Sequence, residues 1–160
     1  MAIEHVIIQM LRDKKLTLAV AESCSGGMLS DFLTAVPGSS EAFLGGIVCY
    51  TNHLKHKLLD VPMELLEGDG APGAVSAETA DVLATQLLSI TGSDYAIAIT
   101  GVAGPSMSEG KPVGLVYVAI ACKGQSVQVD KLQLSGNRES IKLRASKTAL
   151  YQLWKQLKLI

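Results

Sequence analysis

The sequence predicts an α/β fold of three layers, α/β/α, in which helices cover both faces of a mixed, mostly parallel sheet. Segments with the helical repeat of apolar residues alternate with short apolar segments along most of the chain. Late in the chain, two apolar segments at 113–122 and 126–134 are separated only by a short turn containing Lys123 and Gly124. The alternation is typical of parallel strands joined by helices, and the late pair predicts an antiparallel hairpin.

Five elements are expected in the first half of the chain, mainly from the period of their apolar residues. They are a helix at 2–14, a strand at 16–21, a helix that ends near Pro37, a strand at 46–51 and a short helix after Asn52. Asn52 is the predicted N-cap of the short helix, because its side chain can accept a hydrogen bond from a free backbone N–H.

The second half is expected to contain two helices and three strands. They are a helix between Ser76 and Gly92, strands at 95–100, 113–122 and 126–134, and a helix at 138–157. Ser76 suits an N-cap and Gly92 a C-terminal stop. In the last strand the alternation of apolar residues changes phase near Asp130, which predicts a β-bulge.

Length and composition indicate a single domain over residues 1–160. The chain is 48% hydrophobic and 18% charged, and its formal net charge is −1. This balance gives no reason to expect binding to nucleic acid or to a membrane surface. A signal-peptide pattern is lacking and no apolar run reaches membrane-spanning length, so we expect a cytoplasmic protein.

The three cysteines, Cys24, Cys49 and Cys122, are widely separated and form no C-x-x-C pair. We therefore expect neither a zinc site nor a disulfide framework. His53 and His56 are three residues apart, but no carboxylate or cysteine pattern accompanies them, so a metal site is not expected there either.

Three polar or glycine-rich segments directly follow predicted strands, at 22–27, 50–55 and 100–105. Ligands of open α/β sheets bind beyond the carboxyl ends of the strands. We expect these three segments to meet at one edge of the sheet and to form the functional site.

Ser23 is the candidate nucleophile of the first segment. The glycines that follow it, Gly26 and Gly27, would let a substrate approach the backbone, and free N–H groups at the helix start could bind an oxyanion or a phosphate. The alternative is that Ser23 or Ser25 only caps the helix. Cys24 is a rival nucleophile, but no histidine base accompanies it and packing is the simpler interpretation.

Lys55 is the candidate base. If the helix begins after Asn52, Lys55 lies in its first turn, where the helix dipole disfavours a cation and burial would lower the pKa of the amine further. Both effects favour the neutral amine that can deprotonate a serine. Tyr50 and Asn52 offer hydrogen bonds nearby. The alternative is a solvated lysine on a charged helix.

The remaining candidate binding residues lie later in the chain. Thr100 and Gly101 could supply a hydroxyl and backbone donors, or form only a tight turn. Arg138 and Arg144 lie at the start of the last helix, and the arginine fork suits a phosphate, although surface arginines are common.

Several ordered motifs resemble the CinA C-terminal domain family over nearly the whole chain. They are Ala21-Glu22-Ser23-Cys24-Ser25-Gly26-Gly27, Pro37-Gly38-Ser39-Ser40, Tyr50-Thr51-Asn52-His53-Leu54-Lys55, Gly73-Ala74-Val75-Ser76, Thr100-Gly101-Val102-Ala103-Gly104-Pro105, Lys111-Pro112-Val113-Gly114 and Ser135-Gly136-Asn137-Arg138. The chain resembles the stand-alone form of the family. It departs from the family pattern in the loops at 68–73 and 106–110, and Ser25 stands where threonine is usual.

The resemblance implies an amidohydrolase that converts nicotinamide mononucleotide to nicotinic acid mononucleotide and ammonia in pyridine nucleotide recycling. It also implies a serine–lysine arrangement without a metal or other cofactor, and it is compatible with a homodimer or a larger homo-oligomer. The catalytic residues would be Ser23, Lys55 and Tyr50. Substrate contacts are expected from Glu22, Ser25, Gly26, Gly27, Asn52, Thr100, Gly101 and either Arg138 or Arg144. Two alternatives are a catalytically silent nucleotide-binding or assembly domain and an amidase for another small amide.

Overall fold

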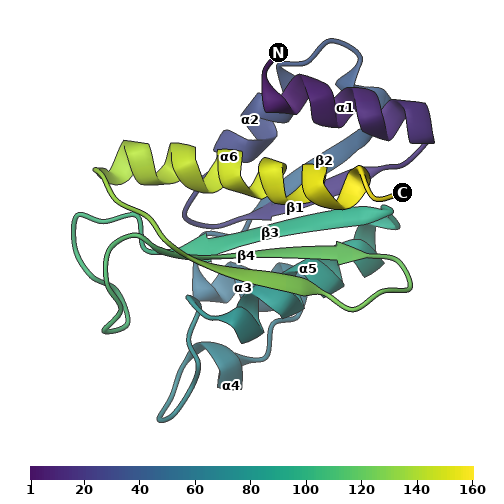
Figure 1. Ribbon diagram of the computed structural model, residues 1–160. Coiled ribbons are helices and arrows are strands. Elements are labelled where there is room, and N and C mark those ends of the chain that lie inside the picture. Colours follow the sequence, from purple (N-terminus) through teal and green to yellow (C-terminus); the bar gives the residue numbers. More distant parts are fainter.

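The computed structural model describes residues 1–160 as a five-stranded sheet with helices on both faces (Figure 1). The helices are α1 (Ile3–Lys14), α2 (Met28–Thr34), α3 (Asn52–Leu59), α4 (Met63–Leu66), α5 (Ala77–Thr91) and α6 (Arg138–Leu157), with a 3₁₀ turn, η1, at Ser39–Glu41. The strands are β1 (Leu18–Glu22), β2 (Phe43–Val48), β3 (Tyr95–Gly101), β4 (Leu115–Cys122) and β5 (Gln128–Gln133). This architecture confirms the predicted α/β fold.

The strands lie in the order β2-β1-β3-β4-β5. The β1 strand pairs in parallel with both β2 and β3, whereas β4 pairs antiparallel with β3 and β5. The predicted hairpin is therefore β4–β5. Its register runs without a shift from the Leu115–Gln133 pair to the Ile120–Gln128 pair, so the predicted β-bulge is wrong. The change in the alternation of apolar residues near Asp130 instead reflects the position of β5 at the partly exposed edge of the sheet.

Alternation of large and small apolar residues along the central strands makes the two faces of the sheet different. In β3, Tyr95, Ile97 and Ile99 pack in the cluster beneath α1, α2 and α6, whereas Ala96 and Ala98 face α5. The same alternation recurs in β1 and β4, because successive strand residues point to opposite faces. Branched side chains thus fill one interface, and the alanine face receives α5 with its own Ala80 and Ala84.

The predicted bounds of β2 and the predicted N-cap of α3 are both wrong. The β2 strand spans Phe43–Val48 rather than 46–51, because its pairing with β1 begins at Phe43 opposite Leu18 and ends at Val48 opposite Glu22. The N-cap of α3 is Thr51, whose hydroxyl accepts from the N–H of Leu54 at 3.3 Å, and Asn52 is the first helical residue. Residues 49–51 therefore leave the sheet and approach the site as irregular backbone.

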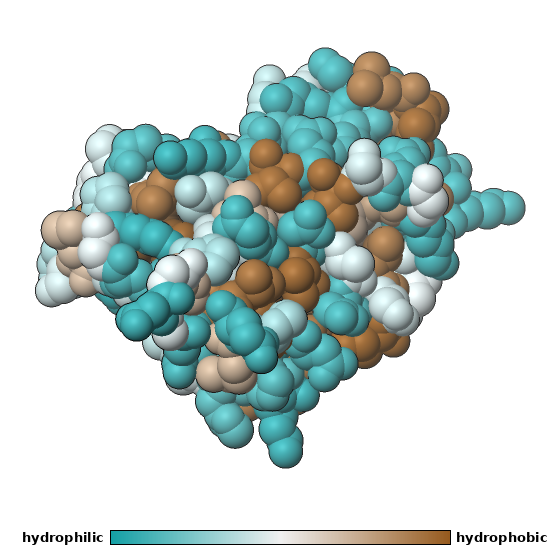
Figure 2. Space-filling view, turned by 90° about the horizontal axis from the view of Figure 1, so that it is seen from below, coloured by the Kyte–Doolittle hydropathy of each residue, from teal (hydrophilic) through white to brown (hydrophobic).

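The carboxyl ends of β1, β2 and β3 lie at one edge of the sheet, since the three strands are mutually parallel. This confirms the predicted meeting of the three strand-end segments. No helix combines the length and apolarity needed to cross a membrane. Seen from the side of α3, α4 and α5, the surface carries separate hydrophobic areas surrounded and interrupted by hydrophilic side chains (Figure 2).

Gly114 joins the hairpin to the turn after β3, and we predict that it tolerates no side chain. Its φ is +91°, and an added Cβ atom would overlap the carbonyl oxygen of Leu134. Gly124 has a similar φ of +75° but open space around it. In urea unfolding, Gly124→Ala should lower the free energy of unfolding by about 1–2 kcal/mol from backbone strain alone. Gly114→Ala should lose about 1–3 kcal/mol more from overpacking; equal losses would contradict the close approach.

Candidate active site

A cavity of about 380 Å³ opens at the carboxyl edge of the sheet. Its lining combines the three strand-end segments with the start of α6, the residues before α5 and the loop before β4. The lining residues that carry polar side chains are Ser23, Cys24, Tyr50, Asn52, Lys55, Thr100, Ser106, Ser108, Glu109 and Arg138. The cavity therefore holds most of the predicted site in one place.

Ser23 directly follows β1 and is 7% exposed. Its backbone N–H donates to the carbonyl of Ile99 at 3.0 Å, which ties the residue to the end of β3. Glu22, the last residue of β1, is fully buried and turns its carboxylate toward the start of α2. That carboxylate accepts from the N–H groups of Gly27, Leu29 and Ser30 and from the Ser30 hydroxyl, at 2.6–3.2 Å. Glu22 therefore holds the turn around Ser23 and does not line the cavity.

Lys55 extends from the first turn of α3 to Ser23 and is only 1% exposed. Its Nζ lies 3.0 Å from Oγ of Ser23, and 2.9 Å and 3.2 Å from the carbonyl oxygens of Cys49 and Tyr50. The predicted proximity of Ser23 and Lys55 is present in the structure. Both carbonyls belong to the backbone that leaves the sheet after β2.

The surroundings of Lys55 favour the neutral amine. Burial lowers the pKa of Lys55, and no carboxylate forms a salt bridge with it. A neutral amine has two N–H bonds and one lone pair, and the two carbonyl oxygens can only accept. In the neutral form these oxygens would accept the two hydrogens, and the lone pair would then be free to accept the hydroxyl hydrogen of Ser23. This is the hydrogen bond by which a base activates a serine.

Cys24, the rival nucleophile, lines the same cavity as an inert thiol. Burial raises the pKa of Cys24 to about 11. Burial also raises the pKa of Cys49, the other cysteine beside Lys55. Because the thiolate is the reactive form of cysteine, neither residue has the chemistry of a nucleophile at neutral pH.

Arg138 crosses the cavity rim between two of the strand-end segments. One guanidinium nitrogen donates to the carbonyl of Gly104 after β3, and Nη2 donates to the Tyr50 hydroxyl at 2.9 Å. No carboxylate pairs with this guanidinium. Arg144 instead donates to the carbonyl and hydroxyl of Ser135, away from the cavity lining. Arg138 is therefore the arginine that an anion in the cavity can reach.

The glycine turn after Ser23 differs from the expected oxyanion site. The N–H of Gly26 donates to the carbonyl of Ser23, and the N–H of Gly27 donates to Glu22. Both glycine donors are occupied. The N–H groups of Cys24 and Ser25 form no hydrogen bond, and the Ser25 hydroxyl is buried without a partner. The free donors thus lie directly after Ser23.

Of the other expected binding residues, Asn52, Thr100 and Gly101 line the cavity, whereas Ser25, Gly26 and Gly27 do not. The cavity is also lined by Ala74, Val75 and Glu109, which were not expected from the sequence. The only signal was local: Gly73-Ala74-Val75-Ser76 is one of the family motifs, and a Glu109-Gly110 pair marks a turn.

The CinA C-terminal domain model matches residues 1–157. A relative from Moorella thermoacetica, described as a competence-damage inducible protein, is 48% identical over 157 residues, 98% of this chain. A relative from Caldicellulosiruptor bescii with the same description is 47% identical over 156 residues, 97% of this chain. In both cases the match spans 37% of the relative's length.

Solved structures of CinA proteins have the same fold as this chain. A CinA superfamily protein from Klebsiella pneumoniae superposes with a TM-score of 0.93 and 30% identity, over 99% of this chain and 97% of that one. The competence/damage inducible protein of Agrobacterium tumefaciens superposes with a TM-score of 0.90 and 35% identity, over 98% and 93%. The chain belongs to the CinA C-terminal domain family.

Proposed function

We propose that this chain is an amidohydrolase that converts nicotinamide mononucleotide to nicotinic acid mononucleotide and ammonia. The observation that carries the proposal is the contact of 3.0 Å between Ser23 Oγ and the buried Nζ of Lys55. A buried amine whose hydrogen-bond partners are all neutral can act as a base, and a serine hydroxyl in its reach can act as a nucleophile. The family resemblance supplies the substrate.

In the proposed reaction, Lys55 takes the hydroxyl proton of Ser23 while Oγ attacks the carboxamide carbon. The resulting ammonium of Lys55 then gives its proton to the amide nitrogen, and ammonia leaves as the carbon–nitrogen bond breaks. An ester between Ser23 and the nicotinoyl group remains. Water attacks this ester with Lys55 again as base, and the acid product leaves as Ser23 regains its proton.

The tetrahedral intermediates carry a negative oxygen that needs hydrogen-bond donors. The N–H group of Cys24 has no acceptor in the protein, and Cys24 directly follows the nucleophile and lines the cavity. We assign the oxyanion to this donor in place of those of Gly26 and Gly27. One such donor contributes roughly 3 kcal/mol to lowering the barrier.

Arg138 is the proposed partner of the substrate phosphate. Its guanidinium is bound only to a carbonyl and a phenol oxygen, so its charge is not neutralised within the protein. Phosphate is the anion of the proposed substrate, and a charge-assisted bond to it is stronger than a bond to a neutral oxygen. Tyr50, which contacts Arg138 through its hydroxyl and Lys55 through its carbonyl, would couple phosphate binding to the base.

The central prediction concerns ammonia release from nicotinamide mononucleotide. Ser23→Ala should lower kcat by at least roughly 10⁴-fold, because the nucleophile is lost. Lys55→Met should do the same, because the base is lost while a side chain of similar length is kept. Cys24→Ala, at a neighbouring position in the cavity, should keep activity. Circular dichroism checks that each variant is folded.

Other results of the same assay would support other functions. Release that survives Ser23→Ala would move the nucleophile elsewhere. No release by the wild type, together with a thermal shift on adding the mononucleotide, would indicate a catalytically silent binding domain. No release and no thermal shift would leave an amidase for another small amide.

A second prediction isolates the phosphate contact. Arg138→Met should raise KM for nicotinamide mononucleotide by about 10- to 100-fold, the worth of a hydrogen bond to a charged group. KM for nicotinamide riboside, which lacks the phosphate, should stay the same. Arg144→Met is the matched control and should change neither value. An equal effect of Arg138→Met on both substrates would refute the assignment.

A further inference from the structure

The turn at 108–111, which contributes to the lining of the candidate active site, has a strained backbone. Ser108 and Lys111 exchange two backbone hydrogen bonds, of 3.3 Å and 2.8 Å, around Glu109 and Gly110. Both central residues have positive φ, 55° and 70°, as in a type I′ turn. Glycine, asparagine and aspartate favour that conformation, whereas a residue such as glutamate loses roughly 1–2 kcal/mol in it. The glutamate therefore needs a compensating interaction.

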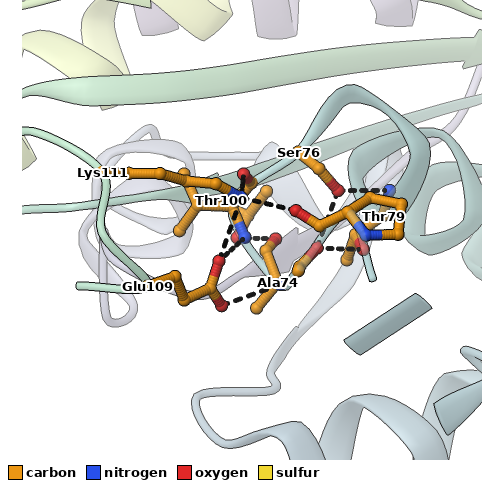
Figure 3. A network of polar contacts seen from close by, with 9 residues as sticks. Ala74, Ser76, Thr79, Thr100, Glu109 and Lys111 are labelled. Atoms are coloured by element: carbon orange, nitrogen blue, oxygen red, sulfur yellow. Dashed lines mark hydrogen bonds and ion pairs between the residues drawn. The ribbon is translucent and has the colours of Figure 1, made fainter. Parts of the chain in front are cut away.

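The carboxylate of Glu109 provides that interaction by binding the backbone before α5 (Figure 3). Its two oxygens accept from the N–H groups of Ala74 at 2.8 Å and Val75 at 3.2 Å. Lys111, at the other end of the turn, donates to the same carboxylate at 3.1 Å. Two consecutive main-chain donors and one ammonium thus hold a single carboxylate.

Lys111 binds the same stretch of backbone through its acceptors. Its ammonium donates to the carbonyl oxygens of Pro72 and Val75, which with Glu109 uses all three of its hydrogens. Gly73 has a φ of +91°, and an added Cβ atom would overlap the Glu109 carboxylate. The turn at 108–111 therefore binds the backbone of residues 72–75 through both N–H and C=O groups.

Two of the residues bound in this way form part of the wall of the active-site cavity. Ala74 and Val75 line that cavity, and the Thr100 hydroxyl holds the Ala74 carbonyl at 2.8 Å from the sheet side. Glu109 also lines a second cavity of about 240 Å³, together with Gly68, Pro72 and Lys111. Glu109 thus belongs to the linings of both cavities.

We propose that Glu109 is a positioning residue of the active site, whose carboxylate holds the backbone of Ala74 and Val75 in the wall of the cavity that also contains Ser23 and Lys55, and separates this cavity from the second one. The substrate in this inference is that of the proposed function. The strain at Glu109 is the observation that distinguishes this role from ordinary turn formation, because asparagine or glycine would form the turn better.

The charge of Glu109 gives the proposal a second readout. Burial lowers the pKa of Lys55, and the negative charge of Glu109 partly offsets this effect. Glu109 is the only carboxylate that acts on the pKa of Lys55. Removing its charge should lower the pKa of Lys55 further. Activity that requires the neutral amine would then persist to lower pH.

Two variants and one control test the proposal. Glu109→Gln keeps the length of the side chain but can no longer accept both N–H bonds, whereas Glu109→Asn suits the turn but is too short to reach the wall. Both should lower kcat/KM for nicotinamide mononucleotide by about 10- to 100-fold, mainly through KM, because the wall is displaced. Both should move the acid limb of the pH profile to lower pH. Glu64→Gln, an exposed carboxylate on α4, should change neither.

Amide hydrogen exchange of Ala74 and Val75 tests the fastening separately from activity. Protection should be lost in both Glu109 variants and kept in Glu64→Gln. Retained protection would overturn the proposal. Lost protection together with a wild-type KM and an unchanged acid limb of the pH profile would also overturn it. A fall in kcat alone would overturn it too, because it would indicate only lost stability. If the wild type releases no ammonia, the proposed function fails and the exchange data alone decide whether Glu109 fastens the wall.

Discussion

An ammonium group buried without a counter-ion is unfavourable by several kcal/mol, and this constraint governs the site around Lys55. The side chain is 1% exposed and has only two carbonyl oxygens and one hydroxyl within hydrogen-bond distance. Losing a proton removes the unfavourable charge and satisfies both carbonyls. Burial thus lowers the pKa of Lys55, and in the proposed function the neutral amine is the base whose lone pair accepts the proton of Ser23.

The sheet brings these groups together from distant parts of the sequence. Parallel pairing of β1 with β2 places Ser23 next to the backbone of Cys49 and Tyr50, and the first turn of α3 then returns Lys55 to the strand ends. Glu22 fixes the turn after Ser23 through the N-terminus of α2, where the helix dipole favours a carboxylate. The proposed catalytic pair, the residues that support it and Arg138 at the rim of the cavity thus depend on one edge of one sheet.

Local patterns in the sequence were sufficient for the features that depend on local chemistry. Ser76 and Gly92 bound α5 as predicted, the last helix spans 138–157, and Lys55 lies in the first turn of its helix. The failures involve contacts between distant residues. The bounds of β2 depend on its pairing with β1, and the hydrogen bond of Glu109 to Ala74 joins residues 35 positions apart. No periodicity or capping rule carries that information.

The most direct test is the protonation of Lys55 itself. In protein labelled with ¹⁵N-lysine, the Nζ resonance of Lys55, assigned by its absence in Lys55→Met, can be followed as a function of pH. We predict that it reports a neutral amine near neutral pH, with a pKa well below the ordinary value for lysine. A resonance that stays that of an ammonium until strongly alkaline pH would contradict the account, because Ser23 would then have no base.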